Sequence, residues 1–392
     1  MKAPPFCTFY AKSPKKSIDA HAGTCYNYHG KLWTKLSERK ENGGDGMRGA
    51  KGNILRKIGR AAWKTVLVLL SVLVLAVLVL WTIPLFERPA DAAVSGSGDW
   101  MAALPDDIPL DRISIPGTHD TGTANAQLAF FSRCQHQGIA RQLADGFRYL
   151  DIRLAVRKTK GGNTLVLMHG VTLCRETYLP WGKPLTLASV LADCYAFLDA
   201  HPGETILFTV SRERGADSVA EIQTLLADAV REQPGYWYAG DGSRLPTLGE
   251  ARGTLVLLRR FNDDAGLGTE SGIHFDWHDQ GGYSDPPQAY SEGYELSEDV
   301  RLFVEDRYEY ETAEKWDAYR APIEASDTEQ ILPLRFLSTK GHAEFGHPYR
   351  FARRLNALLL ENGALPGWTV VDFGTAAAAE KIYSLNFSAE SP

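Results

Sequence analysis

The sequence comprises 392 residues, of which 44% are apolar and 23% are charged. This composition is typical of a globular protein with a sizeable core and excludes a chain that is disordered throughout. Residues 1–64 contain 14 Lys and Arg against 4 Asp and Glu, whereas the remainder contains 28 against 44. A basic head and an acidic body therefore make up the net charge of −6, and we expect no nucleic-acid partner.

The start of the chain predicts a membrane-anchored protein. Residues 1–64 are polar and lack sustained apolar periodicity, so we expect a mostly disordered cytoplasmic tail. Residues 65–86 (TVLVLLSVLVLAVLVLWTIPLF) contain no charged residue, and the next charge along the chain is Glu87. About 20 apolar residues suffice for a helix to cross the hydrocarbon core, so this segment predicts a single transmembrane helix. Its basic N-terminal flank predicts a cytoplasmic N-terminus and an extracytoplasmic body.

A cleaved signal peptide is the alternative, because ADA at 90–92 resembles a cleavage site and cleavage near Ala92 would give a secreted protein. The basic stretch and the apolar run are both longer than in a usual signal peptide, which favours a retained signal anchor. We expect residues 87–100 to form a short linker and residues 101–392 to form the folded domain.

The folded part alternates apolar runs with helical patterns. Several runs are rich in Val, Leu and Ile, as is typical of strands that are covered on both faces. Helical patterns lie between some of them, one with Thr186 as its N-cap and one from Pro348 to Gly363. Eight strands with intervening helices predict an α/β fold, an irregular TIM-type (β/α)8 barrel. The expected strands are 112–115, 148–156, 164–168, 205–211, 254–261, 301–305, 332–338 and 368–373.

Two features of this domain leave alternatives open. Residues 262–300 predict long loops, for which a variable loop is favoured over a lid or an extra carbohydrate contact. Cys134, Cys174 and Cys194 would lie on the oxidising side of the membrane. One disulfide among them and three buried free thiols are both consistent with the sequence.

Polar side chains gather where the expected strands end. ISIPGTHDTG at 113–122 closes a short strand with a Pro-Gly turn, followed directly by His119 and Asp120. The carboxyl ends of barrel strands carry the chemistry of such folds. Each residue alone has an ordinary structural explanation, but buried charges are costly unless they are paired, so their convergence indicates a site. The candidates on the other strands are Asp151, Arg153, His169, Glu204, Arg260, Asp306, Tyr308 and Asp372.

Two histidines around an arginine suit the cleavage of a phosphodiester by internal attack. A neutral imidazole can remove a hydroxyl proton while a protonated one donates to the leaving oxygen. Arginine supplies fixed positive charge to a pentacoordinate phosphorane. A carboxylate behind the basic histidine would fix its tautomer.

The motifs SIPGTHD, DIRL, LMHG, HPGETILFTVSRE, VEDRY and TVVDFGT occur in this order. Together they closely resemble the bacterial-type phosphatidylinositol-specific phospholipase C family over roughly residues 108–388. The resemblance implies a phosphatidylinositol or glycosyl-phosphatidylinositol (GPI) substrate, with diacylglycerol and a 1,2-cyclic inositol phosphate as products.

The same resemblance implies roles for individual residues. His119 matches the general base for the inositol 2-hydroxyl, and Asp372 matches its paired carboxylate. His169 matches the general acid for the leaving group, assisted by Asp120. Arg153 matches the phosphate-stabilising arginine. The remaining matches are Asp151 for local geometry, and Glu204, Arg260, Asp306 and Tyr308 for contacts with the inositol ring.

We expect catalysis without a metal or other cofactor, because Arg153 occupies the place that carboxylates take in calcium-dependent relatives. Two alternatives remain. One is a related phosphodiesterase that acts on glycerophosphodiesters or sphingomyelin. The other is an inactive barrel that binds lipid or glycan, since folds persist after an activity is lost.

Overall fold

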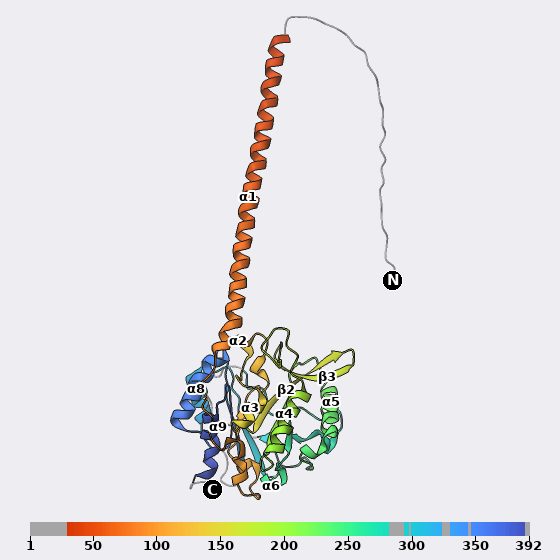
Figure 1. The fold of residues 1–392 in the computed structure, drawn as a ribbon, viewed down its shortest axis with the longest axis vertical. Helices are drawn as coiled ribbons and strands as arrows, with labels where there is room; N and C mark the ends of the chain where they lie inside the picture. Colours follow the sequence, from red (N-terminus) through yellow and green to blue (C-terminus); the bar gives the residue numbers. More distant parts are fainter. Residues whose placement is uncertain (1–29, 282–293, 298, 324–329, 344–345, 389–392) are drawn as a thin grey trace, which may run out of the picture. The chain divides into compact units, whose positions relative to one another are not determined.

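The computed structural model describes residues 30–281, 294–297, 299–323, 330–343 and 346–388. Its first element is a helix of 57 residues, α1 (Gly30–Phe86), drawn in Figure 1. The structure has helix over residues 30–64, where the sequence predicts a disordered tail, although this stretch contains several glycines, which disfavour helix. The part Lys51–Phe86 is long and apolar enough to cross a membrane, which suits an anchor or a signal sequence.

The chain divides after Leu75 into two compact units, and the second unit is an α/β barrel-like domain. One hydrogen-bonded path joins its strands in the order β7-β6-β5-β2-β1-β11-β10-β9-β8. Every neighbouring pair is parallel except β8 with β9. The strands of this path are β1 (Pro116–Thr118), β2 (Tyr149–Thr159), β5 (Ile206–Arg212), β6 (Leu255–Arg259), β7 (Ile273–His274), β8 (Tyr294–Glu295), β9 (Val300–Glu305), β10 (Gln330–Leu337) and β11 (Trp368–Val371).

We call the strands of this path the wall. The wall differs from the expected eight-stranded barrel in three respects. The first strand starts at Pro116, because Leu110–Arg112 forms a 3-10 turn. The expected strand 164–168 belongs to β3 (Gly162–His169), which pairs antiparallel with β2 and with β4 (Thr172–Leu173), outside the wall. The path gains β7 beside β6 instead, a strand that is too short to leave a sequence signal. Among the described residues no strand pairing joins β7 to β8 or β9, so the hydrogen-bonded path is open.

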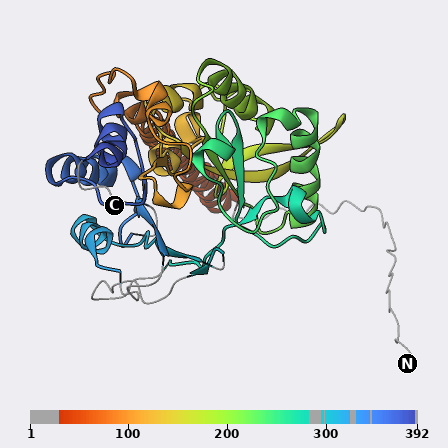
Figure 2. The ribbon, with the colours of Figure 1, turned by 90° about the horizontal axis from the view of Figure 1, so that it is seen from below.

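Helices flank the strands, green ones on one side and blue ones on the other in Figure 2. Two expected helix ends are confirmed. The Thr186 side chain accepts a hydrogen bond from Ser189 N at the start of α4, and Gly363, with φ 92°, ends α8. The helices of the domain are α2 (Ala129–Ser132), α3 (Ile139–Ala144), α4 (Leu187–Ala200), α5 (Val219–Glu232), α6 (Leu248–Ala251), α7 (Thr312–Arg320), α8 (Pro348–Asn362) and α9 (Ala376–Tyr383).

Cys134, Cys174 and Cys194 are buried free thiols, which settles the alternative that the sequence left open. The segment expected as a linker is also ordered against the domain: Trp100 is buried, and its indole donates to Gly146 O at 2.9 Å. The parallel wall places the carboxyl ends of its strands at one edge, where the candidate catalytic residues lie.

Candidate active site

The first pair of site residues follows two neighbouring strands. Thr118 of β1 lies opposite Val371 of β11, so the next residues, His119 and Asp372, lie side by side. His119 Nδ1 lies 2.7 Å from Asp372 Oδ1, and the carboxylate is buried. This contact places a proton on Nδ1 and leaves Nε2 as the nitrogen available for chemistry.

Two carboxylates control the protonation of His119. Burial lowers the pKa of His119, but the charges of Asp372 and Asp120 outweigh burial and raise that pKa to about 9. His119 Nε2 also lies 2.9 Å from Arg153 Nη2, which can donate to the ring only when the ring is neutral. We infer that His119 becomes an effective base at alkaline pH.

Removal of the paired carboxylate gives a directional test of this contact. Asp372→Asn should lower the pKa of His119, and the alkaline rise of kcat/KM should move to lower pH. The maximal rate should also fall, because the imidazolium loses its partner. A pH–rate profile measures both effects. Asp99→Asn is the matched control, since Asp99 pairs with the distant His201 at the same 2.7 Å. An unmoved profile in Asp372→Asn would contradict the pairing.

Asp120 joins the two histidines. Its Oδ2 lies 3.4 Å from His119 Nε2 and 3.5 Å from His169 Nε2, and its Oδ1 lies 3.0 Å from Arg153 Nε. The backbone of Asp120 is left-handed, with φ 44°, which non-glycine residues seldom adopt. Its backbone N donates to Asp151 Oδ2 at 3.0 Å, and this bond supports the turn.

His169 reaches the site from the hairpin strand β3 and not from the wall. Its Nδ1 lies 2.8 Å from the Ser132 carbonyl oxygen, which only an N–H can satisfy, so Nδ1 donates there. The second nitrogen, Nε2, therefore faces Asp120. The rings of His119 and His169 stand with their centroids 6.5 Å apart.

Arg153 lies among carboxylates. It shares a face of β2 with Asp151, and the distance from Nη2 to Asp151 Oδ2 is 3.2 Å. Glu213 Oε2 lies 3.8 Å from Nη1. Burial raises the pKa of Asp151, but Arg153 and then His119 outweigh burial and lower that pKa to about 2. The guanidinium is thus held by fixed negative charges and remains partly exposed.

A polar cavity of about 470 Å³ adjoins Arg153. Arg260 lies on its wall, with its guanidinium carbon 3.4 Å from the ring centre of Trp277. Arg260 Nε is buried and has no hydrogen-bond partner among the described residues, so it retains donor capacity. The residues that line the cavity are Arg153, Ser211, Arg212, Glu213, Val219, Arg260, Phe261, Asn262, Asp264 and Asp276.

Asp306 and Tyr308 lie on the same side of the domain as Trp277. Asp306 Oδ2 accepts from Trp277 Nε1 at 3.1 Å, and Tyr308 donates to Asp279 Oδ1 at 2.9 Å. Trp277 therefore connects Arg260 to Asp306. Residues 282–293 and residue 298 of the expected loop 262–300 lie outside the described residues.

The sequence reasoning missed three residues that contact the site. Glu213 follows β5 and faces Arg153; its place at a strand end is evident from the sequence, but no role was predicted for it. Ser132 contributes only a carbonyl oxygen, for which no sequence signal exists. Cys134 Sγ lies 3.9 Å from both Asp120 Oδ2 and His169 Nδ1.

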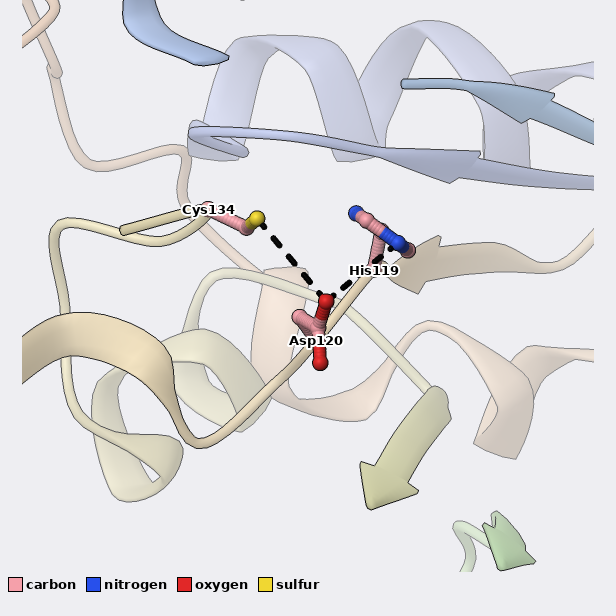
Figure 3. Close-up of side chains that lie close together, drawn as sticks. All are labelled: His119, Asp120 and Cys134. Atoms are coloured by element: carbon pink, nitrogen blue, oxygen red, sulfur yellow. Dashed lines mark hydrogen bonds and ion pairs between the residues drawn. The ribbon is translucent and has the colours of Figure 1, made fainter. Parts of the chain in front are cut away.

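His119, Asp120 and Cys134 form the group of described residues that could best hold a metal ion, with their ligand atoms within 4.8 Å of one another (Figure 3). Arg153 already lies 3.0 Å from this Asp120 carboxylate and would repel a divalent cation. Burial, then the charges of Asp372 and Asp120, raise the pKa of the Cys134 thiol well above its ordinary value, so thiolate is scarce. These donors fit a metal poorly.

Treatment with a chelator tests whether the protein works without a metal ion. We expect phosphodiester cleavage by the purified protein to proceed at the same rate with and without excess EDTA, because fixed arginine charge stands where a cation would act. Added Ca²⁺ should not raise the rate. A loss of activity in EDTA that a divalent cation restores would overturn the reading.

A family model described as phosphatidylinositol-specific phospholipase C, X domain, matches residues 107–261. This segment contains both histidines and Arg153. The match places an X domain of the phosphatidylinositol-specific phospholipase C type in this part of the chain.

Relatives extend the match beyond that segment. The 1-phosphatidylinositol phosphodiesterase of Staphylococcus aureus strain Newman is 25% identical over 305 residues, covering 72% of this chain and 90% of the relative. The Listeria monocytogenes protein of the same name is 28% identical over 182 residues, covering 44% of this chain and 51% of the relative. A crystal structure of phosphatidylinositol-specific phospholipase C from S. aureus shares the fold, with a TM-score of 0.57, 21% identity and coverage of 73% and 97% of the two chains.

In this phospholipase C-type domain, Glu204 does not join the site, which corrects the expected contact with the inositol ring. Glu204 precedes β5 and so lies at the amino end of the wall, opposite the histidines. Its Oε2 accepts from Arg148 Nε at 2.8 Å, and both side chains are fully buried. Its Oε1 accepts from Ala102 N at 2.9 Å. Glu204 is thus a structural residue that ties the expected linker region to the barrel.

Proposed function

We propose that this chain is a phosphatidylinositol-specific phospholipase C that releases diacylglycerol and inositol 1,2-cyclic phosphate. The arrangement of the two histidines is the observation that supports this best. Each has its Nδ1 occupied, by Asp372 in one case and Ser132 O in the other. Their Nε2 atoms meet at one oxygen of Asp120.

In the proposed reaction, His119 Nε2 removes the proton of the inositol 2-hydroxyl. The resulting oxygen forms a bond to phosphorus while the bond from phosphorus to the diacylglycerol oxygen breaks. Protonated His169 Nε2 gives its proton to that leaving oxygen, and Arg153 stabilises the charge that develops on the phosphate. The two histidines exchange protonation states in each turnover, and water restores them.

The inositol ring is proposed to occupy the polar cavity beside Arg153. Arg260 supplies a donor there, and Asp306 and Tyr308 complete the predicted set of ring contacts. Either phosphatidylinositol or a GPI anchor presents this headgroup. Glycerophosphodiesters of other headgroups and sphingomyelin do not present the inositol 2-hydroxyl that attacks phosphorus in the proposed reaction.

One assay tests the activity. The full chain in mixed micelles that contain phosphatidylinositol should produce a cyclic phosphate visible by phosphorus NMR. Phosphocholine from sphingomyelin, or glycerol phosphate from a glycerophosphodiester, would instead favour a related phosphodiesterase. The absence of turnover on every phosphodiester by folded protein would favour a binding role.

We also propose that residues 65–86 span a membrane, with the N-terminus cytoplasmic and the barrel outside. Two contacts made by residues just before the alternative cleavage site support a retained anchor. Asp91 Oδ1 accepts from Ala376 N at 3.1 Å, and Glu87 is buried against the barrel. Cleavage near Ala92 would discard both contacts.

A further inference from the structure

The residues that follow the apolar helix are fastened to the barrel. Glu87 is buried, and its Oε1 lies 2.6 Å from His347 Nε2. Arg133, also buried, donates from Nη2 to Glu87 O at 2.8 Å. A hinge immediately after Phe86 would have to break these contacts. The end of the helix therefore cannot swing freely relative to the domain.

A second contact lies within the apolar helix itself. The Tyr178 hydroxyl donates to Trp81 O at 2.6 Å, and the two rings stack with centroids 5.8 Å apart. Trp81 precedes the helix end by five residues, or about 7.5 Å along the axis. The loop of Tyr178 thus lies at the level of the apolar helix, where Trp and Tyr favour the membrane interface.

Exposed apolar side chains occur in the loop of Tyr178 and in two turns whose neighbouring residues are joined by a hydrogen bond from Gln127 N to Leu173 O at 3.0 Å. Val171 is 89% exposed, Trp181 is 78% exposed and Leu179 is 46% exposed, and Leu128 is exposed as well. We call these four side chains, together with Tyr178, the mouth platform. Large exposed apolar side chains that cluster on neighbouring loops mark an interaction surface.

The mouth platform borders the active site. Val171 follows His169 by two residues at the end of β3. Leu128 begins the turn that leads to Ser132, whose carbonyl oxygen holds the His169 ring. A surface seated on the platform would therefore lie directly beside the proposed general acid.

We propose that the mouth platform rests on the bilayer that holds the apolar helix, so that the enzyme cleaves lipid of its own membrane. This proposal depends on the proposed function and specifies where that function acts. The occupant is a lipid surface, because the platform continues from a membrane-crossing segment through the Trp81–Tyr178 contact. The chain after residue 64 carries 28 Lys and Arg against 44 Asp and Glu, so charge would not draw it to an anionic membrane.

Reconstituted full-length protein tests the proposal. In one arm the protein shares phosphatidylcholine vesicles with a minor fraction of phosphatidylinositol. In the other arm the protein sits in pure phosphatidylcholine vesicles, and phosphatidylinositol is supplied in separate vesicles. We expect cleavage in the shared vesicles to be roughly 10²-fold faster, since attachment raises the effective concentration of substrate. Equal rates in the two arms would overturn the proposal.

Variants separate the platform from the fastened helix end. Leu179→Ser should slow cleavage in shared vesicles several-fold and leave cleavage of a water-soluble short-chain phosphatidylinositol unchanged. Leu360→Ser is the matched control, because Leu360 is 40% exposed near the far end of α8. A flexible Gly-Ser insertion between Phe86 and Glu87 should also slow cleavage in shared vesicles, because the protein stays attached but the platform is no longer held against the bilayer. Equal behaviour of the two serine variants would contradict a role for the platform.

The soluble substrate also distinguishes the two ways of failing. If unaltered protein does not cleave it, the proposed function fails. If unaltered protein cleaves the soluble substrate but shows no preference for lipid of its own membrane, the proposed function stands and only the proposal about the mouth platform fails.

Discussion

Replacing His119 or His169 with alanine should lower the rate of phosphatidylinositol cleavage by roughly 10²–10⁴-fold in each case. The reason is that each ring presents one available nitrogen to the reacting atoms, and no other described imidazole lies close enough to replace it. The double variant should be scarcely worse than the poorer single variant, because the two groups act in one concerted proton transfer. Turnover of phosphatidylinositol in mixed micelles measures the effect.

The roles of the two histidines can be told apart by the leaving group. A substrate analogue with a phenol-type leaving group needs little protonation, so it should restore much of the activity of His169→Ala and little of His119→Ala. His201→Ala is the matched control, since it removes a His–Asp hydrogen bond of the same 2.7 Å length away from the site. Equal rescue of both variants would refute the assignment of base and acid.

Glu204→Ala should destabilise the folded domain by about 3–5 kcal/mol, because it leaves the Arg148 charge buried without its partner. Arg148 is fully buried, and its other printed hydrogen bonds go to carbonyl oxygens, among them Leu143 O at 2.7 Å and Gly98 O at 2.9 Å. Its guanidinium also lies over the Phe197 ring, 4.5 Å from the ring centre, but no other carboxylate pairs with it among the described residues. The thermal midpoint should fall by roughly 10 °C. Thermal unfolding in detergent, followed by circular dichroism, measures the shift.

Controls for this variant separate stability from substrate contact. Glu270→Ala should leave the midpoint nearly unchanged, because the Glu270–Arg231 pair is exposed and screened by solvent. Removing both buried charges, as Arg148→Met with Glu204→Leu, should recover much of the lost stability. If Glu204→Ala instead keeps its full stability and has a raised KM, Glu204 contacts the inositol ring and is not a structural residue.

The sequence was most informative for catalytic candidates that directly follow a strand of the parallel sheet. His119 and Asp372 each follow a strand of the parallel wall, so motif and topology placed them together correctly. Asp151 and Arg153 share a strand face, as their spacing of two residues predicts. The family resemblance supplied the roles, whereas the arrangement of the strands explains why such distant residues meet.

Other features depended on tertiary contacts that no local pattern records. The β3 hairpin has the same apolar run as a wall strand, and only its antiparallel partner reveals that it lies outside. The two residues of β7 are too few to show periodicity. Glu204 was misassigned because the motif match was preferred to its place before the expected strand 205–211, which puts it at the amino end of the parallel strands.

The left-handed backbone of Asp120 has a consequence for how the site is assembled. An L-residue in this conformation costs roughly 1–2 kcal/mol, and the bond to Asp151 and the ion pair with Arg153 offset that cost as the chain folds. The histidines and the arginine are therefore preorganised before any lipid arrives, and little reorganisation remains for the reaction itself. Arg153 then has two roles, because the guanidinium proposed to bind the phosphate also stabilises the turn that contains Asp120.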